Sequence, residues 1–166
     1  MMKAFLLQFK SRDHHTPLVQ FIKYGIAGAI ATSVHIGCFY IMALKFLPAL
    51  SNNDAIAGLL HLAVPEVSNG LRARNSMIDN SVAFLFSNLT AYIINVCWVF
   101  KPGRHHRVLE FLFFFLVSGS SMVIGGILMG ALIKGFGITT THAFVVNMIT
   151  SLMINFVMRK KVVFKG

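Results

Sequence analysis

The chain has 166 residues, of which 56% are hydrophobic and only 12% are charged, and its mean hydropathy is +0.73. A soluble domain carries about 25% charged residues, so a soluble fold has too little polar surface for this composition. The formal charge of +10 is also typical of nucleic-acid-binding proteins, but here the basic residues stand between and after apolar runs. This placement favours the flanks of membrane-spanning helices and argues against a nucleic-acid partner.

Four apolar stretches are long enough to cross a bilayer, which takes about 20 helical residues. They lie at about residues 24–44, 81–100, 111–133 and 138–158, and by this division none contains Asp, Glu, Lys or Arg. We therefore predict an all-α integral membrane protein with four transmembrane helices, in a single membrane domain over residues 1–166. Each half of the chain then forms a hairpin of two helices.

The segment 45–80 between the first two predicted spans is polar at both ends and carries the apolar stretch AIAGLLHLAV in its middle. This stretch is too short to span and stops at Pro65. Asp54 precedes it and is a typical helix N-cap, so we expect a short helix there. A loose extracytoplasmic loop and a helix lying on the outer leaflet remain open as alternatives for this segment.

Lys and Arg residues predict the orientation, because they collect in the cytoplasmic flanks of membrane proteins. Eleven of them lie on one side of the predicted spans and four on the other. The first set is Lys3, Lys10, Arg12, Lys23, Lys101, Arg104, Arg107, Arg159, Lys160, Lys161 and Lys165, and the second is Lys45, Arg72, Arg74 and Lys134. Both termini are therefore predicted to be cytoplasmic, which agrees with an even number of spans.

Two similar phrases close the second and fourth predicted spans, IINVCWVF and INFVMRKKVVF. The phrase FIKYGIAGAIATSV of the first half also loosely matches LFFFLVSGSSMVI of the second, with Gly28 against Gly119. Because both hairpins point the same way, we predict a parallel repeat related by an axis along the membrane normal.

Polar residues recur at helical spacing inside the predicted spans. Intervals of four and of seven place each set on one helix face. The sets are Asn147, Ser151, Asn155 and Arg159 in the fourth span, and Asn88 and Asn95 in the second. Such residues commonly serve helix packing, because they allow close approach and bond across helices. Asn95 and Asn155, however, end their spans at an equivalent depth near the predicted cytoplasmic side, where amides can meet a polar headgroup.

Further candidates lie in the first span and at the span ends. Intramembrane ionisable residues such as His35 are functional candidates, although a neutral histidine bonded to Thr32 or to another helix is a structural alternative. Arg159 and Lys160 serve as topology anchors in the simplest interpretation, but they also suit phosphate by charge. With Trp98 as an aromatic anchor, these residues predict a collar around a phosphate headgroup.

Three phrases resemble the GtrA-like family of membrane proteins, namely FIKYGIAGAIAT, AYIINVCWVF and INFVMRKKVVF. The resemblance covers about residues 21–164, and the third phrase is the most specific, since its asparagine, basic cluster and phenylalanine keep the family's spacing. The family's motif residues fall on Gly28, Thr32, Asn95, Phe100, Asn155, Arg159, Lys160 and Phe164. The chain departs from the family at Val96 and Cys97, where basic residues are usual, and at His35, where many members carry an acid.

The resemblance implies a protein of the inner (cytoplasmic) membrane that flips a polyprenyl-phosphate-linked monosaccharide to the outer face. There a glycosyltransferase would modify O-antigen or another cell-surface polysaccharide. The expected partners are this sugar lipid, membrane lipids and a glycosyltransferase. Because four helices make a thin wall, we also expect a homodimer or a larger assembly. The alternative is a membrane anchor or organiser of a glycosyltransferase without transport activity.

Other classes fit less well. An enzyme is not expected, because the sequence offers no paired carboxylate, no nucleophile with a base and no phosphate-binding glycine loop. No cofactor or metal site is expected either, since Cys38 and Cys97 both lie in apolar runs. A small multidrug-resistance exporter also has four spans but needs a membrane carboxylate. By the division above, all five acids lie outside or at the edge of the spans.

Overall fold

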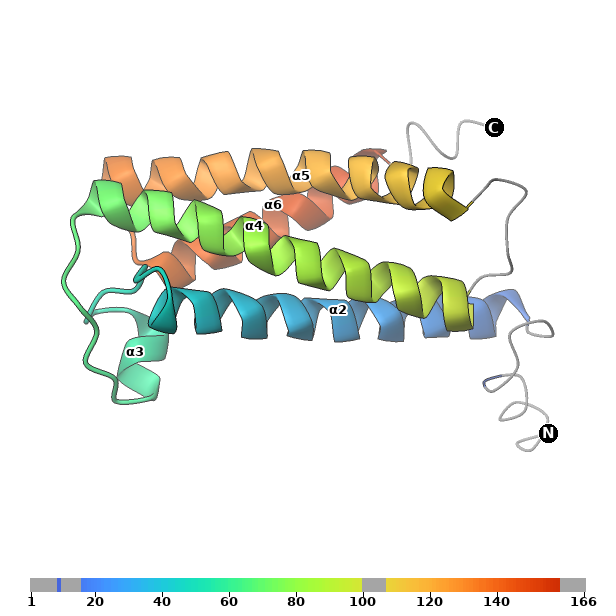
Figure 1. The fold of residues 1–166 in the computed structure, drawn as a ribbon, viewed down its shortest axis with the longest axis horizontal. Helices are drawn as coiled ribbons and strands as arrows, with labels where there is room; N and C mark the ends of the chain where they lie inside the picture. The colour runs from blue at the N-terminus through green and yellow to red at the C-terminus, as the bar shows by residue number, and fades with distance from the viewer. Residues whose placement is uncertain (1–8, 10–15, 100–106, 159–166) are drawn as a thin grey trace.

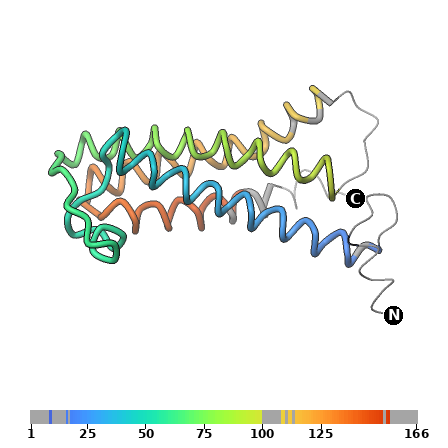
Figure 2. The backbone as a smooth tube through the Cα atoms, turned by 60° about the horizontal axis from the view of Figure 1, so that its bottom comes forward, coloured from blue at the N-terminus to red at the C-terminus, as the bar shows by residue number. Residues whose placement is uncertain are grey.

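The computed structural model describes residues 9, 16–99 and 107–158, and the regular structure in this part of the chain is helical. The helices are α2 (Pro17–Lys45), α3 (Ala55–Leu59), α4 (Asn69–Ile94), α5 (Arg107–Phe136) and α6 (Thr140–Met158), and the π-helical segment η1 (Asn95–Val99) continues α4. The four long helices form an elongated bundle, with α3 beside one end (Figure 1). We call this the α3 end; α2 and α5 begin at the opposite, far end, toward which η1 and α6 also run (Figures 1 and 2).

The long helices pack in a chain of neighbours, α2 along α4, α4 along α5 and α5 along α6. Aromatic rings connect the last helix to the first. The Phe144 ring of α6 stacks on the Phe39 ring of α2 with 3.9 Å between centroids and 6° between planes, and Tyr40 meets Phe144 edge-on at 5.9 Å. Edge-to-face contacts add to the energy of apolar burial, and both ring contacts bury apolar surface between the two helices. They bring α6 against α2 in the half of the bundle toward α3.

The distribution of side chains is the reverse of that in a soluble bundle. The long helices expose large apolar side chains, among them Phe21, Ile41, Leu85, Phe86, Leu116, Ile127 and Met153. The buried face of α4 is instead mostly small or polar and includes Arg72, Asn75, Ser76, Asp79, Asn80, Ser87 and Asn88. A hydrocarbon solvent favours this arrangement, because polar groups must find their partners inside the protein.

Three helices are long and apolar enough to cross a membrane, Leu18–Lys45, Asn69–Val99 and Phe114–Phe136. They correspond to the first three predicted spans, so the chain is a multi-pass, all-helical membrane protein over the residues described. α6 occupies the position of the fourth predicted span. Its crossing of the membrane, the cytoplasmic placement of the termini and the parallel repeat all stay predictions.

The helix that contains the second predicted span begins well before residue 81, at Asn69. The spanning candidate Asn69–Val99 has 31 residues, or about 46 Å at 1.5 Å per residue, and so exceeds the hydrocarbon core of about 30 Å. Arg72, Arg74 and Asp79 therefore lie on the part of this helix that precedes the predicted span, where the sequence alone suggests a loop. The stretch is helical, and its polar side chains are mostly buried against other helices.

The connection between α2 and α4 contains the short helix expected after Asp54. The Asp54 side chain caps α3 by accepting a hydrogen bond from the Ile56 N–H at 3.4 Å, which confirms the predicted cap. The same carboxylate accepts from the Thr141 N–H at 3.0 Å and from the Thr141 hydroxyl. It therefore also lies at the N-terminus of α6, where the helix dipole favours a negative charge.

Further bonds hold the first part of this connection against the bundle. Asn75 of α4 donates to the Pro48 carbonyl at 2.8 Å, and the Thr140 hydroxyl of α6 donates to the Ala49 carbonyl. A loose loop is therefore wrong for residues 48–54. The side chains of Leu59 and Leu60 are exposed beyond it, so an outer-leaflet position for α3 stays a prediction.

We expect Asp54→Ala to destabilise the bundle, because the change removes the caps of two helices at once. Loss of charged hydrogen bonds and an N-cap corresponds to about 2 kcal/mol or more in the free energy of unfolding. Thermal unfolding of the purified protein in detergent measures the effect as a lower Tm. Glu66→Ala, in an exposed acid of the same connection, is the matched control. Equal Tm values for the two variants would contradict the double-cap role.

Candidate functional site

A polar network lies inside the bundle where α2, α4 and α6 meet. The His35 ring of α2 bonds through Nδ1 to the Ser87 hydroxyl and through Nε2 to Asn80 Oδ1, both at 3.1 Å. Asn147 of α6 donates from Nδ2 to the same Asn80 oxygen at 2.8 Å. Because Asn80 Oδ1 only accepts, His35 carries a proton on Nε2 and donates it there. The network therefore joins three helices through one amide oxygen.

Two amide atoms of this network have no partner among the described residues. Asn80 is 0% exposed and Asn147 is 3% exposed. Asn80 Nδ2 and Asn147 Oδ1 are therefore buried, and neither atom has a hydrogen bond in the part of the chain that the structure describes. Buried polar atoms in native proteins are nearly always bonded to protein, water or a ligand. The bundle interior therefore contains one donor and one acceptor without a partner among the described residues.

Glycines of α5 let this network approach closely. A Cβ added at Gly125 would collide with Asn147 Oδ1 and lie 2.8 Å from Ser151 Oγ, and one at Gly126 would lie 3.6 Å from Asn80 Nδ2. Ser151 in turn donates to the Ser121 carbonyl of α5 at 3.2 Å. The predicted stripe of α6 is confirmed for Asn147 and Ser151, which both face α5.

Buried amides continue along α4 toward the far end of the bundle. Asn88 is 5% exposed and Asn95 is 7% exposed, and Asn88 Nδ2 and Asn95 Oδ1 have no hydrogen-bond partner in the described part of the chain. Asn95 opens η1, and π-helical turns within α-helices frequently occur at functional sites. We call Asn80, Asn88 and Asn95 the α4 amide track.

A lysine comes against η1 at the far end. Lys23 Nζ of α2 lies 3.5 Å from the Trp98 carbonyl, to which it donates, and 5.3 Å from the centroid of the Trp98 ring. The indole N–H of Trp98 donates to the Phe9 carbonyl at 2.9 Å, and Gln20 donates to the Val99 carbonyl at 3.5 Å. Cations are favourable at the carbonyl end of a helix and over an indole face. This cluster therefore combines the positive charge of Lys23 with Trp98, which the sequence predicts as an aromatic anchor.

The structure brings together some of the residues predicted for the site and not others. His35 and Asn147 meet through Asn80, and Asn88 and Asn95 are buried on the same helix. Thr32 is exposed on α2, and His35 uses α4 rather than Thr32, which is the other structural alternative considered for it. The side chain of Asn155, and Arg159 and Lys160 entirely, lie outside the described residues. The predicted collar of these groups thus stays a prediction.

Sequence reasoning missed Asp79, Asn80, Ser87 and Lys23. The first two fall just before the predicted start of the second span, in a run that reads as a polar loop. Asp79 is 0% exposed, and neither carboxyl oxygen has a hydrogen-bond partner among the described residues. Asp79 lies at the edge of the predicted second span, and its side chain is buried inside the bundle. The spacing of seven residues between Asn80 and Ser87 places both on one helix face, and this is the signal in the sequence that could have identified Ser87.

Comparison with protein families identifies one matching model over most of the chain. Residues 54–164 match the family described as "GtrA/DPMS, transmembrane domain". The match includes the second and third of the phrases that carry the resemblance and begins after the first. Comparisons with curated proteins and with solved structures each give no match.

We expect Gly125→Ala to destabilise the bundle, because the new methyl group would collide with the Asn147 amide. Forcing one extra carbon into such a contact typically costs about 1–3 kcal/mol. Gly37→Ala is the matched control, since a Cβ there meets nothing within 4 Å and alanine favours helix. A lower Tm in detergent for Gly125→Ala alone is the expected result. Equal stability would mean that α5 and α6 are not held this close.

Asp79→Asn is expected to keep or raise the Tm, in contrast to Asp54→Ala. A carboxylate buried without partners is costly, and an amide of the same shape removes the charge. Thermal unfolding in the same detergent checks this expectation. A fall in Tm comparable to that of Asp54→Ala would show that the Asp79 carboxyl stabilises the fold.

Proposed function

The chain belongs to the GtrA/DPMS transmembrane-domain family, and on that premise we propose that it translocates a polyprenyl-phosphate-linked monosaccharide across the inner membrane. The product would supply synthesis or modification of a cell-surface polysaccharide such as O-antigen. The role is transport without covalent chemistry on the sugar. The observation that carries the proposal is the α4 amide track, with its unpartnered amide atoms buried inside a lipid-facing bundle.

The physical problem of such transport is the polar headgroup. Moving a phosphate and a sugar through about 30 Å of hydrocarbon without partners is prohibitive. Amides suit the sugar, because together they offer donors and acceptors and the sugar hydroxyls need both. Asn80 Nδ2 and Asn88 Nδ2 would donate to the hydroxyls and Asn95 Oδ1 would accept from them, while the isoprenoid tail stays in lipid.

The far end of the bundle is the proposed entry for the phosphate. Lys23 and Trp98 lie together there beside η1. In the predicted topology this end is cytoplasmic, and Asn155, Arg159 and Lys160 would add an amide and two cations at the same depth. Lysine and arginine both pair with phosphate, and arginine does so through its bidentate fork. This group of residues extends the headgroup collar expected from the sequence.

The protein would act with partners. Four helices enclose little space around a sugar, so a homodimer or a larger assembly is part of the proposal. The other partner would be a glycosyltransferase that uses the lipid-linked sugar at the outer face, together with the surrounding membrane lipids.

One observation favours a second function, a membrane anchor or organiser of the glycosyltransferase without transport. His35, Ser87, Asn80 and Asn147 bond to one another, as polar residues that serve only helix packing do. In that case substitutions on the amide track would change stability and leave lipid movement unaffected.

Translocation in proteoliposomes decides between the two functions. The purified chain would be reconstituted with a polyprenyl-phosphate glucose probe, and the probe accessible at the outer face would be followed with time. We expect Asn88→Ala and Asn95→Ala each to lower the rate about tenfold, as the loss of one hydrogen bond of about 1.4 kcal/mol predicts. Asn155→Ala and the double change of Arg159 and Lys160 to Ala test the collar in the same assay.

The control is Asn53→Ala, in an exposed residue of the connection before α3. It should translocate at the wild-type rate, and all variants should keep the wild-type Tm. Wild-type protein that moves the probe no faster than empty liposomes, while folded and oligomeric, would overturn transport. The search would then turn to a bound glycosyltransferase.

A further inference from the structure

The imidazole ring of His35 has a hydrogen-bonding group of α4 at each of its two nitrogens. Nε2 lies 3.1 Å from Asn80 Oδ1, and Nδ1 lies 3.1 Å from Ser87 Oγ. Because the amide oxygen of Asn80 only accepts, Nε2 carries a proton in this arrangement. The charge of the ring is therefore decided at Nδ1, by the direction of its hydrogen bond with Ser87.

The Ser87 hydroxyl has two acceptors within reach for its single proton. Its oxygen lies 3.1 Å from the Phe84 carbonyl, to which it donates, and 3.1 Å from Nδ1 of His35. While the hydroxyl donates to Phe84, its oxygen can only accept at Nδ1, so Nδ1 carries a second proton and the ring is a cation. When the hydroxyl donates to Nδ1 instead, the ring is neutral. Both arrangements use the same positions of the heavy atoms.

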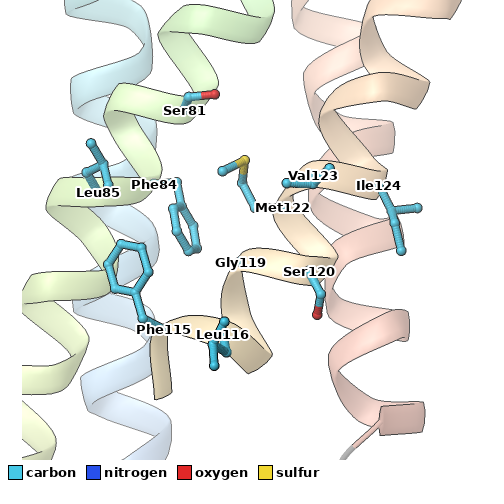
Figure 3. Close-up of a pocket in the computed structure, with 10 residues that line it drawn as sticks. All are labelled: Ser81, Phe84, Leu85, Phe115, Leu116, Gly119, Ser120, Met122, Val123 and Ile124. Atoms are coloured by element: carbon cyan, nitrogen blue, oxygen red, sulfur yellow. The ribbon is translucent and has the colours of Figure 1, made fainter. Parts of the chain in front are cut away.

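Phe84 holds the second acceptor in place. Its ring lies in an apolar groove between α4 and α5, beside the ring of Phe115, which it meets edge-on at 5.4 Å (Figure 3). Its carbonyl is part of the α4 backbone and has two lone pairs, so it can accept from a serine hydroxyl in addition to a helical N–H. A turn of the Ser87 hydroxyl is therefore sufficient to pass between the two states.

The groups that contact the ring are uncharged. α4 contributes Ser87 and Asn80, and α6 contributes the Phe144 ring, stacked at 5.6 Å. In the described part of the chain, no ionisable side chain hydrogen bonds to this ring. Those nearest to it in sequence on α4, on α6 and on α2 itself are Asp79, His142, Cys38 and Tyr40. A buried cation is costly unless its donors are satisfied, and here the two acceptors of α4 would satisfy them.

The ionisable neighbours have other surroundings. Neither oxygen of the Asp79 carboxyl has a hydrogen-bond partner among the described residues. Tyr40 donates to the Thr141 hydroxyl at 3.0 Å, and His142 bonds to the hydroxyl of Thr139. The second proton of the ring thus depends on Ser87 and Asn80 and not on a fixed counter-ion.

We propose that His35 is a reversible proton-binding site inside the bundle, in which the Ser87 hydroxyl turns from Nδ1 to the Phe84 carbonyl as the ring is protonated. The ligand is a proton from the solvent, which adds to Nδ1 of the neutral ring to give an imidazolium, and no other covalent bond changes. Ionisable groups inside membrane proteins commonly belong to proton or ion pathways. The proposal does not depend on lipid transport, although the charge would lie beside Asn80 of the α4 amide track.

Nuclear magnetic resonance of the full chain in nanodiscs, with ¹⁵N-labelled histidine, tests the proposal without any lipid-linked sugar. The shifts of the ring nitrogens distinguish the two neutral tautomers from the cation. His35→Gln identifies the signals of His35 among those of the seven histidines. We expect these signals to pass from the neutral ring with its proton on Nε2 to the cation between about pH 8 and about pH 4. A ring that stays neutral throughout, or a neutral ring with its proton on Nδ1, would overturn the proposal.

Ser87→Ala tests the acceptor of the second proton. Charge-assisted hydrogen bonds are about twice as strong as neutral ones, so losing the hydroxyl disfavours the cation more than the neutral ring. We expect the ratio of cationic to neutral His35 at a given pH to fall about tenfold. The matched control is Ser81→Ala, which removes another α4 hydroxyl that donates to its own helix, at the Met77 carbonyl. It should leave the ratio unchanged, and an unchanged ratio in Ser87→Ala would contradict the role of Ser87.

Asp79→Asn gives a second check that does not touch the ring contacts. It should leave the ratio as in the wild type, whereas loss of the cation in this variant would show that a carboxylate counter-ion holds the proton. Because the readout needs no lipid substrate, failed translocation with a titrating His35 would sink the proposed function alone. Translocation with a His35 that never titrates would sink this inference alone.

Discussion

The lack of water in the bilayer core is the constraint on which this structure depends, because every polar group there must find its partner within the protein. The bundle meets it by turning polar side chains inward, and the amide oxygen of Asn80 is the point where this is most visible, since it accepts from both His35 and Asn147. Gly125 supplies the space that Asn147 needs on α5. Two atoms of this network, Asn80 Nδ2 and Asn147 Oδ1, are left without a hydrogen-bond partner among the described residues.

The two ends of the bundle differ in what their charged side chains contact. At the α3 end, Asp54 bonds to two helix N-termini, and Arg72 donates to the carbonyls of Gly137 and Ile138 between α5 and α6 at 3.1 and 3.0 Å. Both of these charged side chains hold chain segments together. At the far end, Lys23 donates to the Trp98 carbonyl of η1 and lies over the Trp98 ring. One end of the bundle is thus held by charged hydrogen bonds between segments, whereas the other places a cation against an aromatic ring.

Much of this was predictable from residue patterns, and the failures have a physical cause. Apolar length located α2, α5 and α6, the N-cap preference of Asp54 located α3, and the family resemblance was confirmed over residues 54–164. The start of α4 was missed because polarity was taken to mean exposure to water, whereas Asn75, Asp79 and Asn80 are buried between helices. The pairing of His35 with Ser87 and Asn80 depends on the rotation of α2 against α4, which residue spacing within one helix does not contain.

The π-helical turn Asn95–Val99 has a consequence for insertions and deletions. Such a turn accommodates an extra residue compared with an α-helix, and one residue corresponds to about 100° of rotation. Deleting a single residue there would leave the composition, the number of spans and the topology essentially as they are. It would nevertheless rotate Trp98 away from Lys23 and redirect the chain that enters the next basic segment. A deletion of one codon can thus change what the far end of the bundle presents without the substitution of any side chain.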